Sequence, residues 1–460
     1  MPSETPVPPV TRILAEKAAG LRYQDLSAAA VTWAKHCILD WFAVTLPGAA
    51  EPLTRILAAE AAEDGGNAQA TLIGPGGDRV SVPQAALING AAGHALDYDD
   101  VSMAMGGHPT APVLPAVLAL AEAGDFGGPE LLTAFAAGYE CQCAVGRLIG
   151  RSHYAAGFHA TATVGSIGAA VGAARLLGLA ADRTAVAIGL AATQAAGLKS
   201  MFGTMAKPLH AGKAAANGVL AARLARRGFS ANPAALECEQ GFVSTLGGSL
   251  DAEAALAEPA GGYHLCHNLF KYHAACYMTH SPIEALRALR DQLRLYPDAV
   301  ERVTLTVAPG HLKVCNIEEP ATGLACKFSL RQTAAFALAG IDTAALESYS
   351  DENARRPDLV ALRRRVVVDP SNTGPHSGAT VRVELKNGGS AEATRDVGVP
   401  ADDLARQGAR LTEKYLSLAV PALGAERAAR LLESIEEIEA AEKLSLLIGR
   451  ASYPVRSTAA

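Results

Sequence analysis

Apolar residues recur at helical spacing along most of the first half of the chain. Residues 11–46 contain two such stretches, separated by a glycine and ended by Pro47 and Gly48. Further helical patterns follow one another from Pro83 to Arg227. Strands do not alternate with these helices, so the pattern argues against a doubly wound sheet and predicts a helical domain.

Runs with strand character appear in two places. Residues 70–82 have short β-prone runs about a Gly-Pro-Gly-Gly sequence, which predicts a small hairpin. Later in the chain, alternating β-branched runs predict strands at 301–309, 365–370 and 379–397, with helices between them at 281–293, 328–339 and 355–364. This second region therefore reads as an α+β domain.

The two patterns together predict a mainly α protein with a discontinuous organisation. We expect an all-helical domain over residues 1–265 and a smaller α+β domain over residues 266–399. Residues 400–460 are helical again, which predicts that they return to pack on the first domain. A length of 460 residues agrees with two domains, because single cores rarely grow that large.

Composition narrows the class of protein. Half of the residues are hydrophobic but only 5% are aromatic, so small side chains must fill the core between closely packed helices. A net charge of −6 without a basic patch argues against nucleic acid, which leaves a small molecule as the expected partner. The eight cysteines are scattered without a CxxC pair, and no leader or membrane span is recognised. We therefore expect a cytoplasmic protein with reduced thiols and no iron–sulfur cluster.

A cluster of carboxylates interrupts an apolar, helix-like stretch between residues 94 and 120. Asp97, Asp99 and Asp100 lie close together, and His108 follows Gly106-Gly107 at the start of a predicted helix. At least two of the aspartates are expected to cap helix ends or turns. A histidine before a helix N-terminus is favoured in its neutral, basic form. Asp97 and His108 are candidates for catalysis, His108 as a base, and Asp100 is a candidate substrate ligand.

Three later segments add basic groups in small or apolar surroundings. His159 lies at the entry to a long helix of small residues, Lys207 lies in AKPLHAGK, and Lys271 lies in LFKYH. An ammonium in such surroundings needs an anionic partner, which a bound carboxylate would supply. The neighbouring residues His210, Lys213 and Tyr272 are further candidates for binding the substrate. No metal-binding signature such as HExxH accompanies them.

The motifs ALDYDD, GGHPTAPVLPA, GFHATATVGSIGAA, AKPLHAGKAAANG and FKYHAACYMTH resemble, in order, those of the MmgE/PrpD family. This family includes 2-methylcitrate dehydratases, cis-aconitate decarboxylases and an iminodisuccinate epimerase. The resemblance implies a large helical domain with a smaller α+β lid, usually in a homodimer. It also implies that Asp97, His108 and His159 are active-site residues, and on that basis we rank Asp97 first and Asp100 second among the carboxylates. Val101 stands where citrate-type members carry a threonine, which favours a different, less charged carboxylate.

These groups suit removal of a proton α to a carboxylate. Such a reaction needs fixed cations around the carboxylate and a base near the carbon, which Lys207, Lys271 and a histidine can supply. We therefore expect a cofactor-independent and metal-free lyase, a dehydratase of a hydroxy-di- or tricarboxylate similar to 2-methylcitrate. The alternatives are an epimerase or isomerase, a decarboxylase of a related acid, and a carboxylate-binding protein without catalysis.

Overall fold

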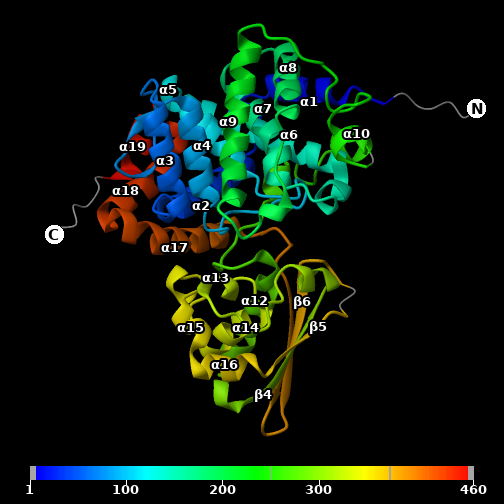
Figure 1. Cartoon of the computed structure of the whole chain (residues 1–460), viewed down its shortest axis with the longest axis vertical. Coiled ribbons are helices and arrows are strands. Elements are labelled where there is room, and N and C mark those ends of the chain that lie inside the picture. Colours follow the sequence, from blue (N-terminus) through cyan, green and yellow to red (C-terminus); the bar gives the residue numbers. More distant parts are fainter. Residues whose placement is uncertain (1–6, 249, 372–373, 454–460) are drawn as a thin grey trace, which may run out of the picture. The chain divides into compact units, whose positions relative to one another are not determined.

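The computed structural model describes residues 7–248, 250–371 and 374–453, and the chain divides into two compact units. The first, called the helical unit here, comprises residues 1–270 and 402–460. The second, called the sheet unit, comprises residues 271–401. The sequence analysis placed the corresponding boundaries after residues 265 and 399. Figure 1 shows the elements of each unit along the chain.

The helical unit consists mainly of α-helices, several of which are long and almost fully buried. Its N-terminal helices are α1 (Val10–Gly20), α2 (Ala28–Gly48), α3 (Pro52–Asp64), α4 (Val82–His94), α5 (Thr110–Ala123), α6 (Gly128–Ala155), α7 (Ala160–Leu176), α8 (Ala181–Ala192), α9 (Ala206–Arg226), α10 (Phe242–Leu246) and α11 (Ala252–Leu256). Its C-terminal helices are α17 (Leu404–Leu423), α18 (Ala425–Glu436) and α19 (Ser445–Arg450).

Small residues allow the central helices to approach one another closely. Helix α7 is buried along nearly its whole length and packs against α5, α6, α8 and α9. At Gly212 on α9, an ideal Cβ would lie only 2.0 Å from the carbonyl oxygen of Leu87 on α4. Any side chain there would push α4 and α9 apart. The low aromatic content of the sequence therefore reflects how these helices pack.

The predicted hairpin over residues 70–82 is present but takes part in a second pairing. Strands β1 (Ala70–Thr71) and β3 (Arg79–Val80) pair antiparallel. Between them, β2 (Gly74–Pro75) pairs in parallel with β8 (Ser452–Tyr453) from the end of the described chain. This contact joins the first and last parts of the helical unit.

Helix α17 attaches to the N-terminal helices through a buried ion pair. The ammonium of Lys414 lies 2.6 Å from Oδ1 of Asp40 on α2, and the two side chains are 3% and 2% exposed. The same ammonium donates a hydrogen bond to the carbonyl oxygen of Tyr98 (2.8 Å) and lies 4.0 Å from the centre of its ring. Lys414 on α17 therefore binds the turn around Tyr98, which also carries the acidic residues.

The sheet unit contains a four-stranded sheet in the order β5-β4-β6-β7. Its strands are β4 (Val300–Val307), β5 (Val366–Asp369), β6 (Gly378–Leu385) and β7 (Ser390–Asp396), and its helices are α12 (His280–Leu293), α13 (Gly323–Cys326), α14 (Leu330–Ala339), α15 (Asp351–Arg355) and α16 (Pro357–Arg363). Strand β4 pairs in parallel with β5 and antiparallel with β6.

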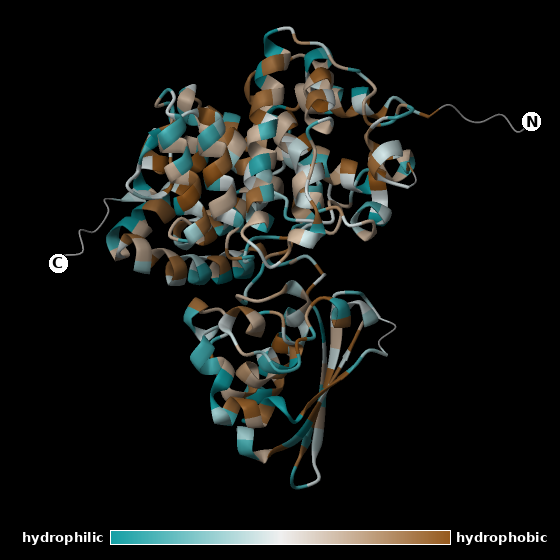
Figure 2. Cartoon of the chain, viewed as in Figure 1, coloured by the Kyte–Doolittle hydropathy of each residue, from teal (hydrophilic) through white to brown (hydrophobic). Residues whose placement is uncertain are grey.

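Alternation along the strands explains the core of the sheet unit. Val303, Leu305 and Val307 on β4 are fully buried, and they pack with apolar residues of β6, α12 and α14. Figure 2 shows hydrophobic and hydrophilic residues interspersed along the ribbons of this unit. The strands and helices that the sequence predicts in this region agree with these elements to within a few residues. Among the described residues, no helix combines the length and apolar character that crossing a membrane requires.

We expect Lys414→Met to lower the free energy of unfolding by about 3–5 kcal/mol, because it leaves the Asp40 carboxylate buried without its cation. Urea denaturation followed by circular dichroism measures this loss. The matched control is Arg430→Met, which removes a cation from an exposed pair with Glu426 and should cost less than about 1 kcal/mol. Equal losses in the two variants would show that the buried pair does not anchor α17.

Candidate active site

The turn after α4 positions the acidic residues. Helix α4 ends at His94, and Asp97 has a positive backbone φ of 51°. Left-handed backbone is uncommon for a residue with a side chain. The amide of Asp97 donates to the carbonyl oxygen of His94 (3.2 Å), which closes the turn. As a result Asp97 and Asp99 both contact His108, whereas Asp100 is bound by other residues.

The loop before α5 holds His108 against the start of α7. The amide of His108 donates to Oγ1 of Thr161 (3.1 Å). An ideal Cβ on the preceding Gly107 would lie 2.9 Å from the backbone nitrogen of Thr161, so a larger residue would displace the loop. The backbone of His108 is thus fixed by α7 while its imidazole contacts the acidic turn.

Two further helix starts bring in the basic groups. His159 immediately precedes α7, and its amide donates to the carbonyl oxygen of Gly197 (3.0 Å). Lys207 and His210 lie near the start of α9, three residues apart and therefore on one face. Nδ1 of His210 lies 3.0 Å from Nδ1 of His159, so one of the two atoms carries a proton.

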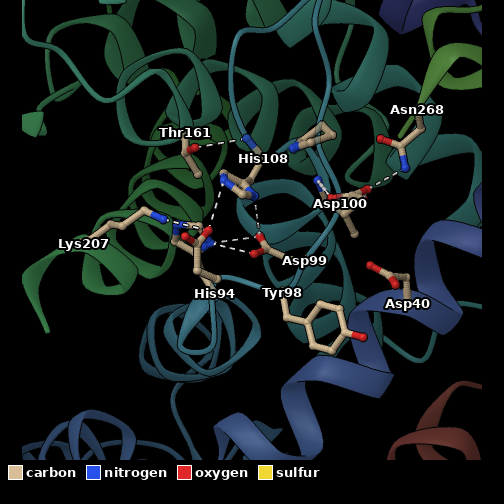
Figure 3. A network of polar contacts seen from close by, with 12 residues as sticks. Asp40, His94, Tyr98, Asp99, Asp100, His108, Thr161, Lys207 and Asn268 are labelled. Carbon is tan, nitrogen blue, oxygen red and sulfur yellow. Dashed lines mark hydrogen bonds and ion pairs between the residues drawn. The ribbon is translucent and has the colours of Figure 1, made fainter. Parts of the chain in front are cut away.

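A continuous series of polar contacts joins these segments (Figure 3). The ammonium of Lys207 lies 2.8 Å from Oδ1 of Asp97, which lies 3.6 Å from Nε2 of His108. On the other edge of the same imidazole, Nδ1 lies 3.2 Å from Oδ2 of Asp99. Both oxygens of Asp99 lie 2.9 Å from Nδ1 of His94. We call these five residues the polar cluster.

Exposure divides the polar cluster into an outer and an inner part. The side chains of Asp97, His108 and Lys207 are 25%, 13% and 13% exposed. Those of His94 and Asp99 are 0% and 1% exposed. A small molecule can therefore reach the outer three residues, while the inner two can act only through them.

The surroundings set the charges of the inner residues. Burial alone would raise the pKa of Asp99, but the two imidazoles, His108 foremost, hold that pKa well below its ordinary value. Burial lowers the pKa of His94 to about 4, and only part of this effect is offset by Asp99. Burial also lowers the pKa of His159 well below its ordinary value. His94 and His159 are therefore neutral near pH 7, and Asp99 is ionised.

Asp100, predicted as a substrate ligand, lies instead in a buried network behind the turn. Its carboxyl accepts hydrogen bonds from the Thr110 hydroxyl and from Nδ2 of Asn268 (2.9 Å). Burial, followed by the negative charge of Asp40, raises the pKa of Asp100 to about 8. With 1% of its surface exposed, Asp100 joins the turn to α5 and is poorly placed to touch a substrate.

The remaining predicted residues differ in their surroundings. Lys213 is exposed on α9, and its spacing from Lys207 places it on another face of the helix. Lys271 and Tyr272 begin the sheet unit, where Lys271 is 2% exposed and Tyr272 is partly buried. The structure thus brings Asp97, His108 and Lys207 into direct contact, with His159 and His210 paired beside them.

A divalent cation is one conceivable occupant of the polar cluster. One ligand atom from each of His94, Asp97, Asp99 and His108 lies within 4.8 Å of the others. Imidazole and carboxylate ligands suit transition metals. However, the ammonium of Lys207 already neutralises Asp97, and Asp99 already faces two imidazoles. An ion would have to displace these contacts, so we interpret the cluster as proton-transfer and anion-binding groups.

Comparison with known proteins assigns the chain to a family. The model of the MmgE/PrpD N-terminal domain matches residues 12–255, and that of the C-terminal domain matches residues 273–440. The chain belongs to the MmgE/PrpD family. This confirms the resemblance inferred from the motifs.

Several curated relatives of this MmgE/PrpD chain carry the same name. It is similar to a cis-aconitate decarboxylase of Aspergillus terreus, with 28% identity over 97% of each chain. It is 33% identical to the Homo sapiens cis-aconitate decarboxylase over 51% of this chain and 49% of that protein. The Mus musculus protein of the same name is 28% identical over 82% of this chain and 79% of its own.

Sequence reasoning missed three residues at this MmgE/PrpD site. His94 and Asp99 belong to the polar cluster, and Phe202 packs edge-on against His159, with 5.0 Å between ring centres. The ammonium of Lys207 lies 5.3 Å from the centre of the same Phe202 ring. Asp99 lay within the acidic run but was not chosen among its carboxylates, and His94 stands just before that run; Phe202 carried no signal. The positive φ of Asp97, and the different partners of Asp99 and Asp100, were not readable from the pattern.

We expect the protein to lose stability as the pH falls from 6.5 to 4. Burial lowers the pKa of His36, His94 and His264 to about 4 each. The unfolded chain, with histidine pKa values near 6.5, therefore binds more protons in this window, which favours unfolding. Asp100 and Glu140 act in the opposite direction, because burial raises their pKa values to about 8 and about 7.

The histidines outweigh these two carboxyls, since burial also lowers the pKa values of His159 and His280 well below the ordinary value. Urea denaturation at pH 7, 6 and 5 measures the trend. His36→Gln, which removes one such group outside the polar cluster, should reduce the slope by up to about 1.4 kcal/mol per pH unit. A free energy of unfolding that is constant or rises on acidification would contradict the expectation.

Proposed function

We propose that the chain is a cofactor-independent and metal-free lyase, and that its reaction is the decarboxylation of cis-aconitate or a close analogue. The observation that supports this most is the series Lys207–Asp97–His108. It places a cation, a carboxylate and an imidazole side by side where a small molecule can reach them. The relatives named cis-aconitate decarboxylase favour a triacid as substrate, whereas Val101 in place of the family threonine favours a less charged analogue.

The chemistry of such a substrate defines what the site has to do. When a β,γ-unsaturated carboxylate loses CO₂, the electron pair of the breaking C–C bond forms a new double bond. The original double bond takes up one proton at its far carbon. The protein must therefore hold the spectator carboxylates with fixed cations and deliver a proton to carbon.

The polar cluster can supply both functions. A substrate carboxylate can replace Asp97 beside the ammonium of Lys207, exchanging one charge-assisted contact for another. His108 can deliver the proton through Nε2, the ring nitrogen that faces Asp97. His159, neutral and paired with His210, is a second group that can donate or accept a hydrogen bond.

The other substrate carboxylates need further partners. We keep Lys271, Tyr272 and His210 as proposed ligands for them, on the strength of the sequence pattern and the family motifs. Lys213 is not kept, because it is exposed on another face of α9 from Lys207. Phe202 supplies an apolar surface next to Lys207 and His159, which favours a substrate with an uncharged carbon segment at that position.

Dehydration of a 2-methylcitrate-like hydroxy acid is the second candidate. Elimination of water needs a base for the α proton and an acid for the leaving hydroxyl. The structure offers two imidazoles, His108 and His159, on neighbouring segments. An epimerase would use the same pair to remove and return a proton at one carbon. A binding protein without catalysis would bind the acid and exchange no proton.

We expect proton NMR of the purified protein in D₂O with cis-aconitate to show loss of CO₂ and a product that carries deuterium at the protonated carbon. The panel also contains citrate, 2-methylcitrate, malate and iminodisuccinate analogues. A new vinylic signal from a hydroxy acid would instead indicate a dehydratase. Deuterium uptake without net conversion would indicate an epimerase, and silence across the panel would overturn the proposed lyase.

We expect Lys207→Met to lower kcat/KM by about ten- to a hundredfold, because a hydrogen bond from a charged group is lost. Arg226→Gln removes an exposed positive charge from the same helix and should leave kcat/KM unchanged. His108→Gln removes the proposed proton donor and should abolish deuterium incorporation into the product. Activity should survive exhaustive dialysis against EDTA, whereas a loss that Zn²⁺ or Mn²⁺ restores would contradict metal-free chemistry.

A further inference from the structure

Asp99 lies between two imidazoles and faces the same atom of each. Its oxygens lie 2.9 Å from Nδ1 of His94 and 3.2 Å from Nδ1 of His108. The rings of His94 and His108 are 4.4 Å apart at their centres. A carboxylate that is 1% exposed therefore forms the link between an outer and an inner histidine.

An ionised carboxylate can accept hydrogen bonds but cannot donate them, and this restricts both imidazoles. Each ring must carry a proton on Nδ1 to make a favourable contact with Asp99. For neutral His94 this leaves Nε2 as a bare lone pair, and Nε2 of His94 has no hydrogen-bond partner in the described part of the chain. A buried lone pair without a partner is easier to tolerate than a buried N–H without one.

The same restriction determines which atom of His108 can react. Nδ1 of His108 lies 3.2 Å from Oδ2 of Asp99 but makes no aligned hydrogen bond in the described part of the chain. A proton on this atom faces the carboxylate of Asp99, so we take Nε2 as the atom at which His108 gains or loses a proton. That atom lies 3.6 Å from Oδ1 of Asp97, on the accessible side of the polar cluster. Asp99 itself is too buried to touch a substrate, so it can act only through His108.

We propose that Asp99 is a positioning residue that fixes the proton of His108 on Nδ1 and thereby presents Nε2 to the substrate. His94 holds Asp99 from the inner side. The catalytic consequence rests on the proposed lyase function, but the proton position on His108 does not depend on it. In this proposal Asp99 and His94 position His108, and Asp97 and Lys207 lie on its accessible side.

A purely structural role for Asp99 predicts a different response to an amide. An asparagine at position 99 has one accepting oxygen and one donating nitrogen, so it cannot accept hydrogen bonds from two imidazoles at once. If one ring keeps its proton on Nδ1, the ring that faces the NH₂ group must move its proton to Nε2. A residue that served packing alone would leave both tautomers as they are.

The experiment is ¹⁵N NMR of the full-length protein labelled at its histidines, with two-bond ¹H–¹⁵N correlations that distinguish the two neutral tautomers. Comparison with a His108→Gln sample assigns the His108 ring, and His94→Gln assigns His94. We expect both rings of the wild type to carry the proton on Nδ1. A His108 ring protonated only on Nε2 in the wild type would overturn the proposal without any variant of Asp99.

In Asp99→Asn, one of the two rings should change to the Nε2 tautomer while the thermal midpoint stays measurable. The matched control is Asp100→Asn, which alters the neighbouring buried carboxyl. Asp100 is bound by Thr110 and Asn268 rather than by either imidazole, so both tautomers should persist. Unchanged tautomers in Asp99→Asn would contradict the proposal, and unfolding of this variant would leave the wild-type spectrum as the deciding result.

The activity arm separates this inference from the proposed function. If the wild type decarboxylates cis-aconitate, Asp99→Asn should lower kcat by about 10²–10⁴ with little change in KM, because the proton-transfer group is misdirected while the binding groups remain. A raised KM with an unchanged kcat would contradict a positioning role. If the wild type converts no acid in the panel, the proposed function fails and the tautomer result still decides the role of Asp99.

Discussion

The buried ammonium of Lys414 is the contact on which the rest of the helical unit depends. It neutralises Asp40 on α2, donates a hydrogen bond to the carbonyl oxygen of Tyr98 and lies against the Tyr98 ring. Tyr98 stands between Asp97 and Asp99, so one cation from a late helix fixes the backbone from which the active carboxylates project. Removing either charge would take away the ion pair that neutralises the other, buried charge. Helix α17, from the C-terminal part of the chain, therefore stabilises the turn that carries the candidate active-site carboxylates.

The polar cluster follows from this arrangement as a graded series from solvent to core. Lys207 and Asp97 are the accessible end, His108 is the link, and Asp99 with His94 forms the buried end. The three aspartates of the turn have different partners. Asp97 and Asp99 contact His108, whereas Asp100 is bound by Thr110 on α5 and by Asn268. The exposed end carries the charges of Lys207 and Asp97. At the buried end, Asp99 stays ionised and His94 stays neutral near pH 7.

Much of the fold was readable from the sequence, because long periodic helices and alternating strands carry strong local signals. The helices over residues 83–227 and the strands of the sheet unit appear where the pattern placed them. The pairing of β2 with β8 was not readable, since it joins two-residue strands nearly 400 positions apart. Buried charge pairs such as Asp40 with Lys414 have no local pattern either.

The candidate site was readable only in its outer part. Asp97, His108 and Lys207 stood out because charged groups in small, apolar surroundings require an explanation, and the structure places them in contact. Asp99 and Asp100 could not be told apart, because their roles depend on the positive φ of Asp97 and on which neighbours lie beneath the turn. His94 and Phe202 looked like ordinary helix and loop residues until their neighbours in space were known.

The discontinuous helical unit has a consequence for synthesis on the ribosome. Residues 1–270 emerge first, yet Asp40 and the β2 segment have to wait for Lys414 and Ser452, which follow the whole of the sheet unit. Synthesis of the chain from residue 271 to Ser452 takes on the order of ten to forty seconds at about 5–20 residues per second. During that time the surface of α2 that later receives α17 is open, and its aspartate is hydrated. The sheet unit, contiguous in sequence and with its own core, can fold in the interval.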